Sequence, residues 1–211
     1  MDLDGGYLVK DVTELAALYN PARERSIRKQ IDHLDEHCRS FIAASPLVII
    51  GTQGKGPGGA ADTSPRGDVP GFVKVADDHT LLIPDRPGNN RLDNLRNIVQ
   101  NPAVGLLFVV PGVSETFRVN GEAVVSRDPA LLGLFEVQAK APRTVLVVTV
   151  KEAYMHCSKA LLRADLWNPA KFVAPGVLPS FGTILAVHTD GFVDAQTVDE
   201  ENRNRTPQML Y

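Results

Sequence analysis

Short apolar segments follow one another along the chain after Pro46, and they leave few possible folds. Six of them are rich in β-branched residues, which predicts strands over 47–52, 72–75, 80–83, 104–110, 115–125 and 144–150. Only two helices are predicted between the strands, over 90–100 and 129–138. Strands so rarely separated by helices do not suit a doubly wound parallel sheet. We therefore predict a mainly β fold with flanking helices, in which an antiparallel sheet closes into a barrel.

The segment 115–125 indicates that one face of this sheet is buried. Apolar residues and a glycine occupy every second position, and polar residues occupy most of the others. The first face carries Phe117, Val119, Gly121, Ala123 and Val125. One face of the strand is thus expected to meet a core, and the other solvent or a partner.

An amphipathic helix is predicted before the barrel, over residues 23–44. Its apolar side chains recur at steps of three and four, at Ile27, Ile31, Leu34, Cys38 and Phe41. At the other end of the chain, residues 197–211 are polar. We expect this tail to be flexible unless it docks on a neighbouring molecule.

The composition is that of a folded globular protein. Of 211 residues, 44% are hydrophobic and 22% are charged, which excludes a disordered chain, a collagen and a disulfide scaffold. The net charge of −3 favours neither DNA nor an anionic membrane, so any anion site must be built locally. The longest apolar stretch, Ala103 to Val110, is too short to span a bilayer, and the N-terminus is acidic where a secretory signal is basic. A cytoplasmic protein is expected.

One glycine motif is not interpreted as a nucleotide site. Residues 54–59 read GxGxxG directly after the strand 47–52, where a dinucleotide-binding fingerprint begins. That fingerprint needs a helix to follow at once, and Pro57, Pro65 and Pro70 prevent one. We expect a mobile glycine loop between two strands.

Two patterns of metal-binding residue types are not interpreted as metal sites. Residues 33–37 read HxxEH, but Leu34 and Cys38 belong to the apolar stripe, so both histidines are expected on a solvated helix face. His156 and Cys157 are adjacent, and adjacent strand residues point to opposite faces. Because the two cysteines show no CxxC or zinc spacing, we expect reduced thiols and no metal.

Two segments carry residue types that suit an anion. Residues 62–68, predicted as a turn between strands, present Arg66 among small residues. In the second segment, Asn89 or Asn90 is expected to cap the helix that follows, which places Arg91 in its first turn. A cation there is unfavourable unless an anion lies beside the helix N-terminus. An anion site is therefore predicted.

Five blocks of sequence also resemble the pyridoxamine 5'-phosphate oxidase-like FMN-binding split barrels, in particular their FMN-dependent enzyme branch. They are SPRGDVPG (64–71), IPDRPGNNRLDNL (83–95), NPAVGLLF (101–108), RVNG (118–121) and HCSKAL (156–161). The resemblance covers about residues 24–190. It implies a six-stranded antiparallel Greek-key split barrel, a homodimer, and FMN in a cleft shared by the two subunits. We expect a single domain over 1–211, with an N-terminal helical segment (1–45), the split barrel (46–155) and a C-terminal segment that completes the cleft and the dimer (156–211).

The resemblance also implies a set of cofactor-binding residues. Residues 65–68 would contact the flavin, Pro84 and Asp85 would lie near its ring, and Asn90 with Arg91 would bind its phosphate. Leu92 stands where the family has a lysine, which Arg86 or Lys159 would replace. The complete set is Ser64, Arg66, Asp68, Pro84, Asp85, Arg86, Asn89, Asn90, Arg91 and Lys159.

The substrate is left open by the sequence. Residues 154–159 (YMHCSK) differ from the segment with which pyridoxamine phosphate oxidases bind their substrate's phosphate, so that substrate is not expected. His156, Lys159 and Arg163 are the candidates for the substrate side. The expected function is an FMN-dependent oxidoreductase that transfers a hydride to or from a small substrate, with NADH, NADPH or oxygen as possible redox partners. The alternative is a flavin- or haem-binding module without turnover.

Overall fold

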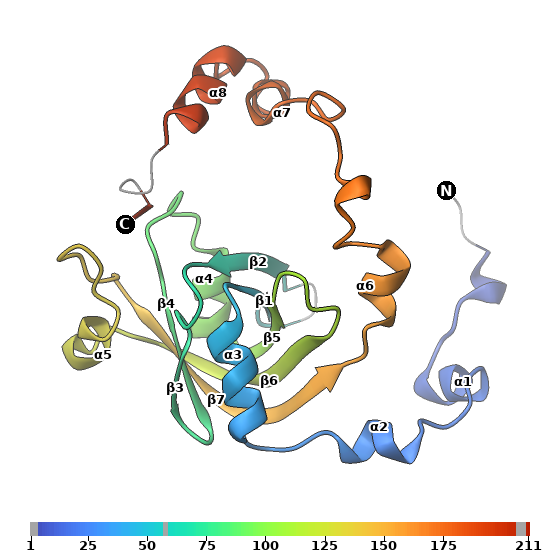
Figure 1. Ribbon diagram of the computed structural model, residues 1–211. Helices are drawn as coiled ribbons and strands as arrows, with labels where there is room; N and C mark the ends of the chain where they lie inside the picture. The colour runs from blue at the N-terminus through green and yellow to red at the C-terminus, as the bar shows by residue number, and fades with distance from the viewer. Residues whose placement is uncertain (1–3, 57–58, 206–209) are drawn as a thin grey trace.

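Seven antiparallel strands form the body of the molecule (Figure 1). The computed structural model describes residues 4–56, 59–205 and 210–211. The strands are β1 (Leu47–Gln53), β2 (Ala61–Gly67), β3 (Lys74–Asp77), β4 (Thr80–Pro84), β5 (Ala103–Val109), β6 (Thr116–Ser126) and β7 (Val145–His156). Their order in the sheet is β2-β1-β5-β6-β7-β4-β3. The predicted mainly β, antiparallel split-barrel class is confirmed, with seven strands rather than six.

Helices flank this sheet, and most of them are short. They are α1 (Val12–Ala17), α2 (Glu24–Arg28), α3 (Glu36–Ala44), α4 (Asp93–Gln100), α5 (Pro129–Gly133), α6 (Lys159–Ala164), α7 (Phe181–His188) and α8 (Ala195–Arg203), with 3-10 turns at Gly5–Tyr7 and Pro169–Lys171. No helix within the described residues is long and apolar enough to cross a membrane. The Asp128 side chain caps α5 by accepting a hydrogen bond from the Ala130 N–H, and the helix ends at Gly133, short of the predicted 138.

The additional strand is β2, which the sequence predicted as a turn over 62–68. It pairs with β1 along its whole length, from Ala61 opposite Gln53 to Gly67 opposite Leu47. Pro65 obscures this strand in the sequence, since proline lacks the N–H that a central strand must donate. Because β2 is an edge strand, one side of it needs no such donor. The motif glycines Gly54, Gly56 and Gly59 lie in the β1–β2 connection, while residues 57–58 fall outside the described residues.

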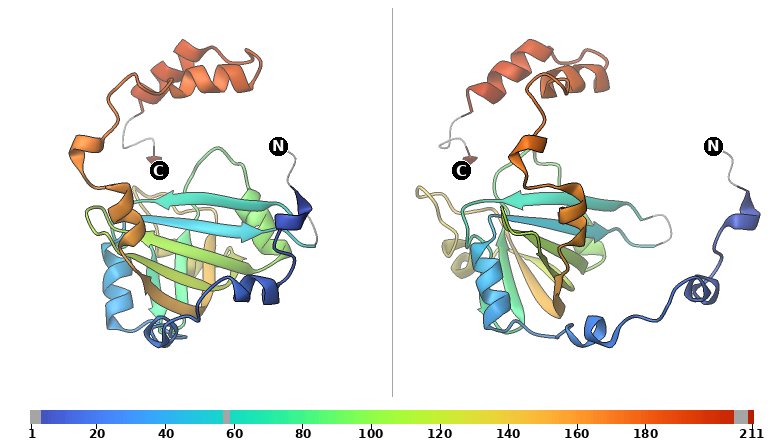
Figure 2. Two further views of the ribbon diagram at one scale, coloured as in Figure 1. Left: turned by 90° about the vertical axis from the view of Figure 1, so that its right-hand side faces the viewer. Right: turned by 45° about the vertical axis from the view of Figure 1, so that its right-hand side comes forward.

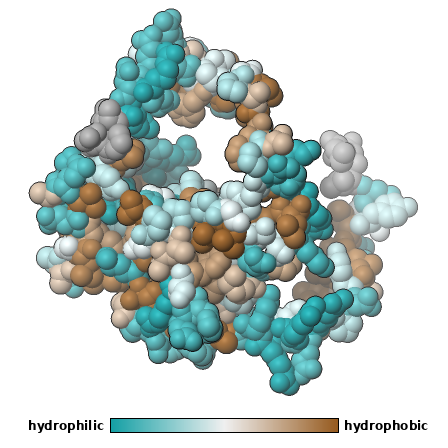
Figure 3. Space-filling view, viewed as in Figure 1, coloured by the Kyte–Doolittle hydropathy of each residue, from teal (hydrophilic) through white to brown (hydrophobic). Residues whose placement is uncertain are grey.

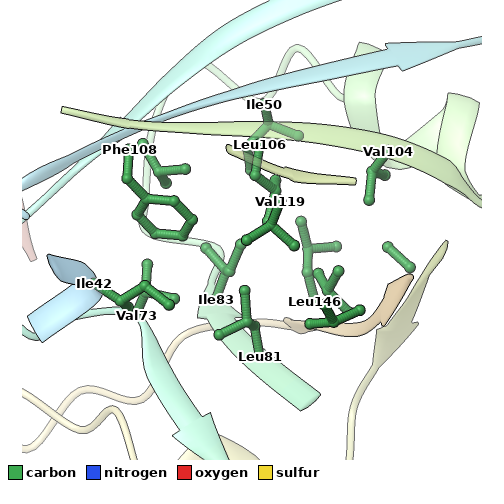
Figure 4. Close-up of a cluster of buried hydrophobic side chains, with 14 of the residues drawn as sticks. Ile42, Ile50, Val73, Leu81, Ile83, Val104, Leu106, Phe108, Val119 and Leu146 are labelled. Carbon is green, nitrogen blue, oxygen red and sulfur yellow. The ribbon is translucent and has the colours of Figure 1, made fainter. Parts of the chain in front are cut away.

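The hydrophobic core fills the inside of the curved sheet (Figure 4). Every second residue of the strands points inward, as the alternation in 115–125 predicted for Phe117, Val119 and Ala123. Full burial of each large side chain contributes about 1.5–3 kcal/mol relative to exposure. The labelled core residues come from α3, from the strands around it and from the connection before β3: Ile42, Ile50, Val73, Leu81, Ile83, Val104, Leu106, Phe108, Val119 and Leu146.

The single helix predicted over 23–44 is wrong. Helix α2 ends at Arg28 and α3 begins at Glu36. Between them Ile31 forms an isolated bridge with Ala153 of β7, with N–H to carbonyl distances of 3.1 and 2.8 Å. The Asp35 side chain then accepts a hydrogen bond from the Cys38 N–H and caps α3. Backbone pairing and a new cap therefore override a continuous apolar stripe.

The two ends of the chain form arms that stand away from the barrel (Figure 2). The N-terminal arm holds α1 and α2, and the C-terminal arm holds α7 and α8, which pack against each other. The predicted flexible tail is wrong over its first part, because α8 continues to Arg203. Tyr211 then returns to the barrel of the same chain, where its hydroxyl donates to Asp68. Both cysteines are free, as predicted.

Candidate functional site

A cavity lies between β2 and the end of β4. Its volume is about 620 Å³, within the range of small-molecule sites. The walls come from β2, from the loop after β4, from the loop before β7 and from Tyr211. Seven of the residues predicted to bind a cofactor line it: Arg66, Pro84, Asp85, Arg86, Asn89, Asn90 and Arg91. The structure thus brings together the two segments that the sequence identified as suited to an anion.

The loop after β4 turns its polar residues into the cavity. The Asp85 N–H donates to the Thr144 carbonyl at 2.9 Å, which fixes the start of the loop beside β7. Asn90 adopts a left-handed conformation with φ of 56°, which asparagine tolerates better than most residues. The Asn89 side chain accepts from the Arg91 N–H at 3.0 Å and closes the turn.

This local geometry corrects the predicted helix start. Helix α4 begins at Asp93, its cap position is Leu92, and no side chain caps it. Neither Asn89 nor Asn90 is the cap, and Arg91 precedes the helix instead of lying in its first turn. Asp93 supplies the acidic group that favours a helix N-terminus and accepts a hydrogen bond from Arg91 at 2.6 Å. The Asp93 carboxylate therefore offsets the predicted repulsion between Arg91 and the helix dipole.

A buried polar network holds Arg66 at the cavity wall. Its guanidinium donates to Ser64 Oγ at 2.7 Å and to the Pro65 carbonyl at 3.1 Å. Ser64 in turn donates to Asn94 of α4, which is 2% exposed and donates to Thr52 at 3.0 Å. Ser64 therefore supports the cavity from behind, since its side chain positions Arg66 and is not part of the lining.

The sequence analysis missed Asn94, Asn97 and Thr52 in this network. Asn97 donates to Thr52 at 3.1 Å and to the Ala60 carbonyl at 3.1 Å, which extends the network to the start of β2. A signal was present, because polar Asn94 and Asn97 share the buried face of α4 with Ile98. Polar groups at core positions need partners, and here they are the strands beside the cavity.

Asp85 is a half-buried carboxyl group at the cavity wall. Its nearer oxygen lies 4.0 Å from Arg66 Nη2. Burial raises the pKa of Asp85 above its usual value, although the charges of Arg66 and Arg143 act in the opposite direction. The cavity can therefore offer a proton-holding group near two cations.

Asp68 and Arg86 form a buried ion pair beside the cavity. Arg86 Nε donates to Asp68 at 2.8 Å, and Arg86 Nη1 donates to the Phe135 carbonyl at 2.7 Å. Burial alone raises the pKa of Asp68, but hydrogen bonds from Tyr211, the Val69 N–H and Arg86 outweigh it and lower the pKa. Asp68 is thus committed to protein partners, and Arg86 keeps only part of its hydrogen-bonding capacity for a ligand.

The remaining predicted site residues lie outside the lining of this cavity. Lys159 begins α6 and is exposed, and its carbonyl accepts from Arg163 at 3.2 Å. His156 ends β7 opposite Thr116. Its Nε2 atom is buried and has no hydrogen-bond partner among the described residues. The structure does not bring His156, Lys159 or Arg163 to the cavity within one chain, and their roles stay predictions.

The HxxEH residues lie on the surface near the start of α3. His33 Nδ1 is 2.9 Å from Asp32, and His37 Nε2 is 3.7 Å from Glu36. Within the ranges 4–56, 59–205 and 210–211, no three His, Cys, Asp or Glu side chains gather as they would around a metal ion.

Known proteins are similar to this chain over the barrel. A family model described as Pyridoxamine 5'-phosphate oxidase matches residues 34–157, from the segment before α3 to the end of β7. No curated protein sequence matches the chain. Among solved structures, a single-residue variant of HupZ from Group A Streptococcus is 16% identical, with 58% of this chain and 99% of that chain covered at a TM-score of 0.48.

Two further solved structures are similar at lower scores. A protein related to general stress protein 26, of the pyridoxinephosphate oxidase family, from Clostridium acetobutylicum is 14% identical over 57% of this chain and 85% of its own, with a TM-score of 0.41. The FAD-binding protein from Mycobacterium smegmatis is 18% identical over 60% of this chain and 97% of its own, with a TM-score of 0.40.

The partly buried histidine at the end of β7, His156, predicts a pH effect on stability. Burial, followed by the charges of Arg118 and Lys29, lowers the pKa of His156 in the folded chain. Between the unfolded value of about 6.5 and the lower folded value, the unfolded state binds more protons, so stability falls as the pH decreases through this window. When the pH is lowered from about 7.5 to about 5.5, the free energy of unfolding should therefore decrease less in His156→Gln than in the wild type. Urea denaturation at each pH measures this free energy. Equal losses in the two proteins would contradict the prediction.

Proposed function

The chain belongs to the pyridoxamine 5'-phosphate oxidase family. On this premise we propose that it is an FMN-dependent oxidoreductase that transfers a hydride between the flavin and a small substrate. One observation carries the proposal, namely the cavity between β2 and β4 with its excess of cations. Among the described residues that line it, Asp85 is the one Asp or Glu side chain, whereas five side chains are cationic: Arg66, Arg86, Arg91, Lys140 and Arg143. Such a lining suits a planar ligand that bears a phosphate.

The residues present fit the phosphate of FMN at one end of the cavity. The guanidinium of Arg66 is already oriented by Ser64 and Asn94, so little side-chain entropy is lost when an anion binds. Asn90 and Arg91 face the same cavity from the loop after β4. Arg66, Asn90 and Arg91 would hold the phosphate, and Pro84 with Asp85 would border the ring.

Bound FMN would supply the hydride chemistry, and the chain would supply binding and orientation. The Asp85 N–H donates a hydrogen bond to the carbonyl of Thr144, the residue before β7. This bond fixes the backbone after Pro84, which would give the ring a rigid wall. Asp85, whose pKa burial raises, is the group beside this wall that can hold a proton.

We further propose that the protein acts as a homodimer. Both arms expose large apolar side chains to solvent (Figure 3), including Tyr7, Val12, Phe172, Phe181 and Phe192. Helices as short as α1 and α7 are marginal in water without tertiary packing. A second copy that covers the arms would supply this packing, and the C-terminal segment 156–211 would complete the cleft.

The visible spectrum of the purified protein tests the function. FMN bands near neutral pH should bleach when NADH or NADPH is added without oxygen, since a reductase passes the hydride to the flavin. A Soret band would instead favour the haem-binding alternative, and flavin bands that no donor bleaches would favour the flavin-binding module. A colourless protein that also fails to bind added FMN would contradict the proposal.

Arg66→Ala should weaken FMN binding far more than riboflavin binding. A charge-assisted hydrogen bond to phosphate contributes roughly 1.5–3 kcal/mol, which corresponds to about a ten- to hundredfold loss. Riboflavin has the same ring but no phosphate, so its affinity should change little. Fluorescence titration of both ligands measures the difference.

Two further arginine variants make this comparison specific. Arg91→Ala should cause a smaller FMN loss, because the Arg91 side chain is 79% exposed and is paired with Asp93. Arg127→Ala is the control, since Arg127 lies outside the cavity lining. Equal losses for FMN and riboflavin in Arg66→Ala would show that Arg66 shapes the cavity without binding phosphate.

Light scattering should give twice the chain mass of 22.9 kDa at micromolar concentration. Phe181→Asp and Val187→Asp should shift the protein towards the monomer, because each places a charge on the exposed apolar face of α7. Val99→Asp on α4 is the matched control, with a side chain of similar exposure outside the arms. A wild-type mass near 22.9 kDa, unchanged by FMN, would rule out the shared cleft.

A further inference from the structure

The loop before β7 brings two cations to the mouth of the cavity. Lys140 and Arg143 both line the cavity. Neither forms an ion pair with an Asp or Glu side chain among the described residues. Arg143 acts electrostatically on Asp85, so it lies near the wall that would border the flavin ring. These cations lie on a different segment from Asn90 and Arg91, which were assigned to the phosphate.

The turn that presents Lys140 has an unfavourable backbone. Val137 and Lys140 exchange two hydrogen bonds of 3.0 and 2.9 Å, and the two residues between them, Gln138 and Ala139, have φ of 51° and 59°. A two-residue turn with both central residues at positive φ prefers Asn-Gly, because larger L-residues are strained there. Strain of this kind is often found at functional sites. The tight turn fixes the point from which Lys140 enters the cavity wall.

Tyr211 indicates which chemical groups can bind beside Arg86 and Lys140. Its ring faces the Arg86 guanidinium with 5.2 Å between the guanidinium carbon and the ring centroid. Its main-chain oxygen accepts a hydrogen bond from Lys140 Nζ at 2.8 Å. The chain therefore places a planar ring against one cation and an oxygen acceptor against another. These atoms stand in for an aromatic ring and the oxygen of an anionic group on a ligand.

We propose that Lys140 and Arg143 form a second anion subsite in this cavity, which binds the carboxylate of an aromatic second reactant, and that Tyr211 occupies the same subsite when that reactant is absent. The substrate class would then be planar aromatic or heteroaromatic carboxylates. The role of the ligand as the compound that exchanges a hydride with FMN rests on the proposed function. The subsite itself does not, because it is built from residues of the chain. Tyr211 would compete with the ligand, and its displacement would open the ring position beside Arg86.

Benzoate and benzamide are the probes, because they share a ring and differ in charge. Their affinities are measured by equilibrium dialysis on the full-length chain, with and without saturating FMN. The double variant Lys140→Gln/Arg143→Gln should weaken benzoate about tenfold or more and leave benzamide within about twofold. Tyr211→Ala should tighten benzoate, because it removes the competing ring.

A lysine outside the cavity is the matched control. Lys171→Gln removes the same charge from an exposed turn and should leave both probes unchanged. FMN affinity should fall less than benzoate affinity in the Lys140 and Arg143 variants, because the direct hydrogen bonds to its phosphate are assigned to Arg66, Asn90 and Arg91. This readout also separates the two proposals. Benzoate binding that depends on Lys140 and Arg143 in a chain that does not bind FMN would preserve the subsite and refute the flavin function.

Three results would overturn the subsite. The first is an equal loss for benzoate and benzamide, which would mean that the variants disturb the fold of the loop. The second is a benzoate affinity that Tyr211→Ala leaves unchanged or weakens. The third is the absence of benzoate binding at millimolar concentration in both the wild type and Tyr211→Ala.

Discussion

A buried chain of hydrogen bonds ties the edge strand β2 to helix α4, and the geometry of the cavity depends on it. Strand β2 pairs only with β1, so the sheet alone leaves one side of it unsupported. The bonds from Arg66 through Ser64 and Asn94 to Thr52 supply the second attachment. Because Asn94 is almost fully buried, any shift of α4 would leave polar groups without partners, which costs about 1–3 kcal/mol for each group. The cavity wall is therefore fixed before a ligand arrives.

The positive charge of the cavity is a local feature of a chain whose net charge is −3. The lining contains more arginine and lysine than carboxylate side chains. One of these cations, Arg86, is already paired with the buried carboxylate of Asp68. Because Arg86 also donates to the Phe135 carbonyl, its main effect is to hold the segment after β2 against the end of α5. The cations that remain for ligands come from β2, from the loop after β4 and from the loop before β7. Attraction for anions is thus concentrated at one place and does not extend over the surface.

The sequence predicted the parts of the structure that depend on regular patterns. The alternation of 115–125 identified a strand with one buried face, because that signal is local. It failed where tertiary pairing outweighs local preference. Ile31 leaves a helical stripe to pair with Ala153, and Pro65 lies in a strand because that strand is at an edge. Among the cavity residues, Arg66 and Arg91 were found from their chemistry, and Pro84, Asp85 and Arg86 from the family resemblance. Lys140 and Tyr211 carry no local signal and become relevant only through the fold.

Pro65 has a consequence for how copies of this protein can meet. An edge strand with a free row of N–H and C=O groups is a template onto which another chain can add a strand, which leads to domain swapping or fibrils. Proline at position 65 removes one donor from the open side of β2, and the short β3 forms the other edge. Continuous sheets that run from one molecule into the next are therefore disfavoured at both ends. If the arms associate as proposed for the homodimer, contacts between their side chains would allow a closed assembly of defined size without aggregation.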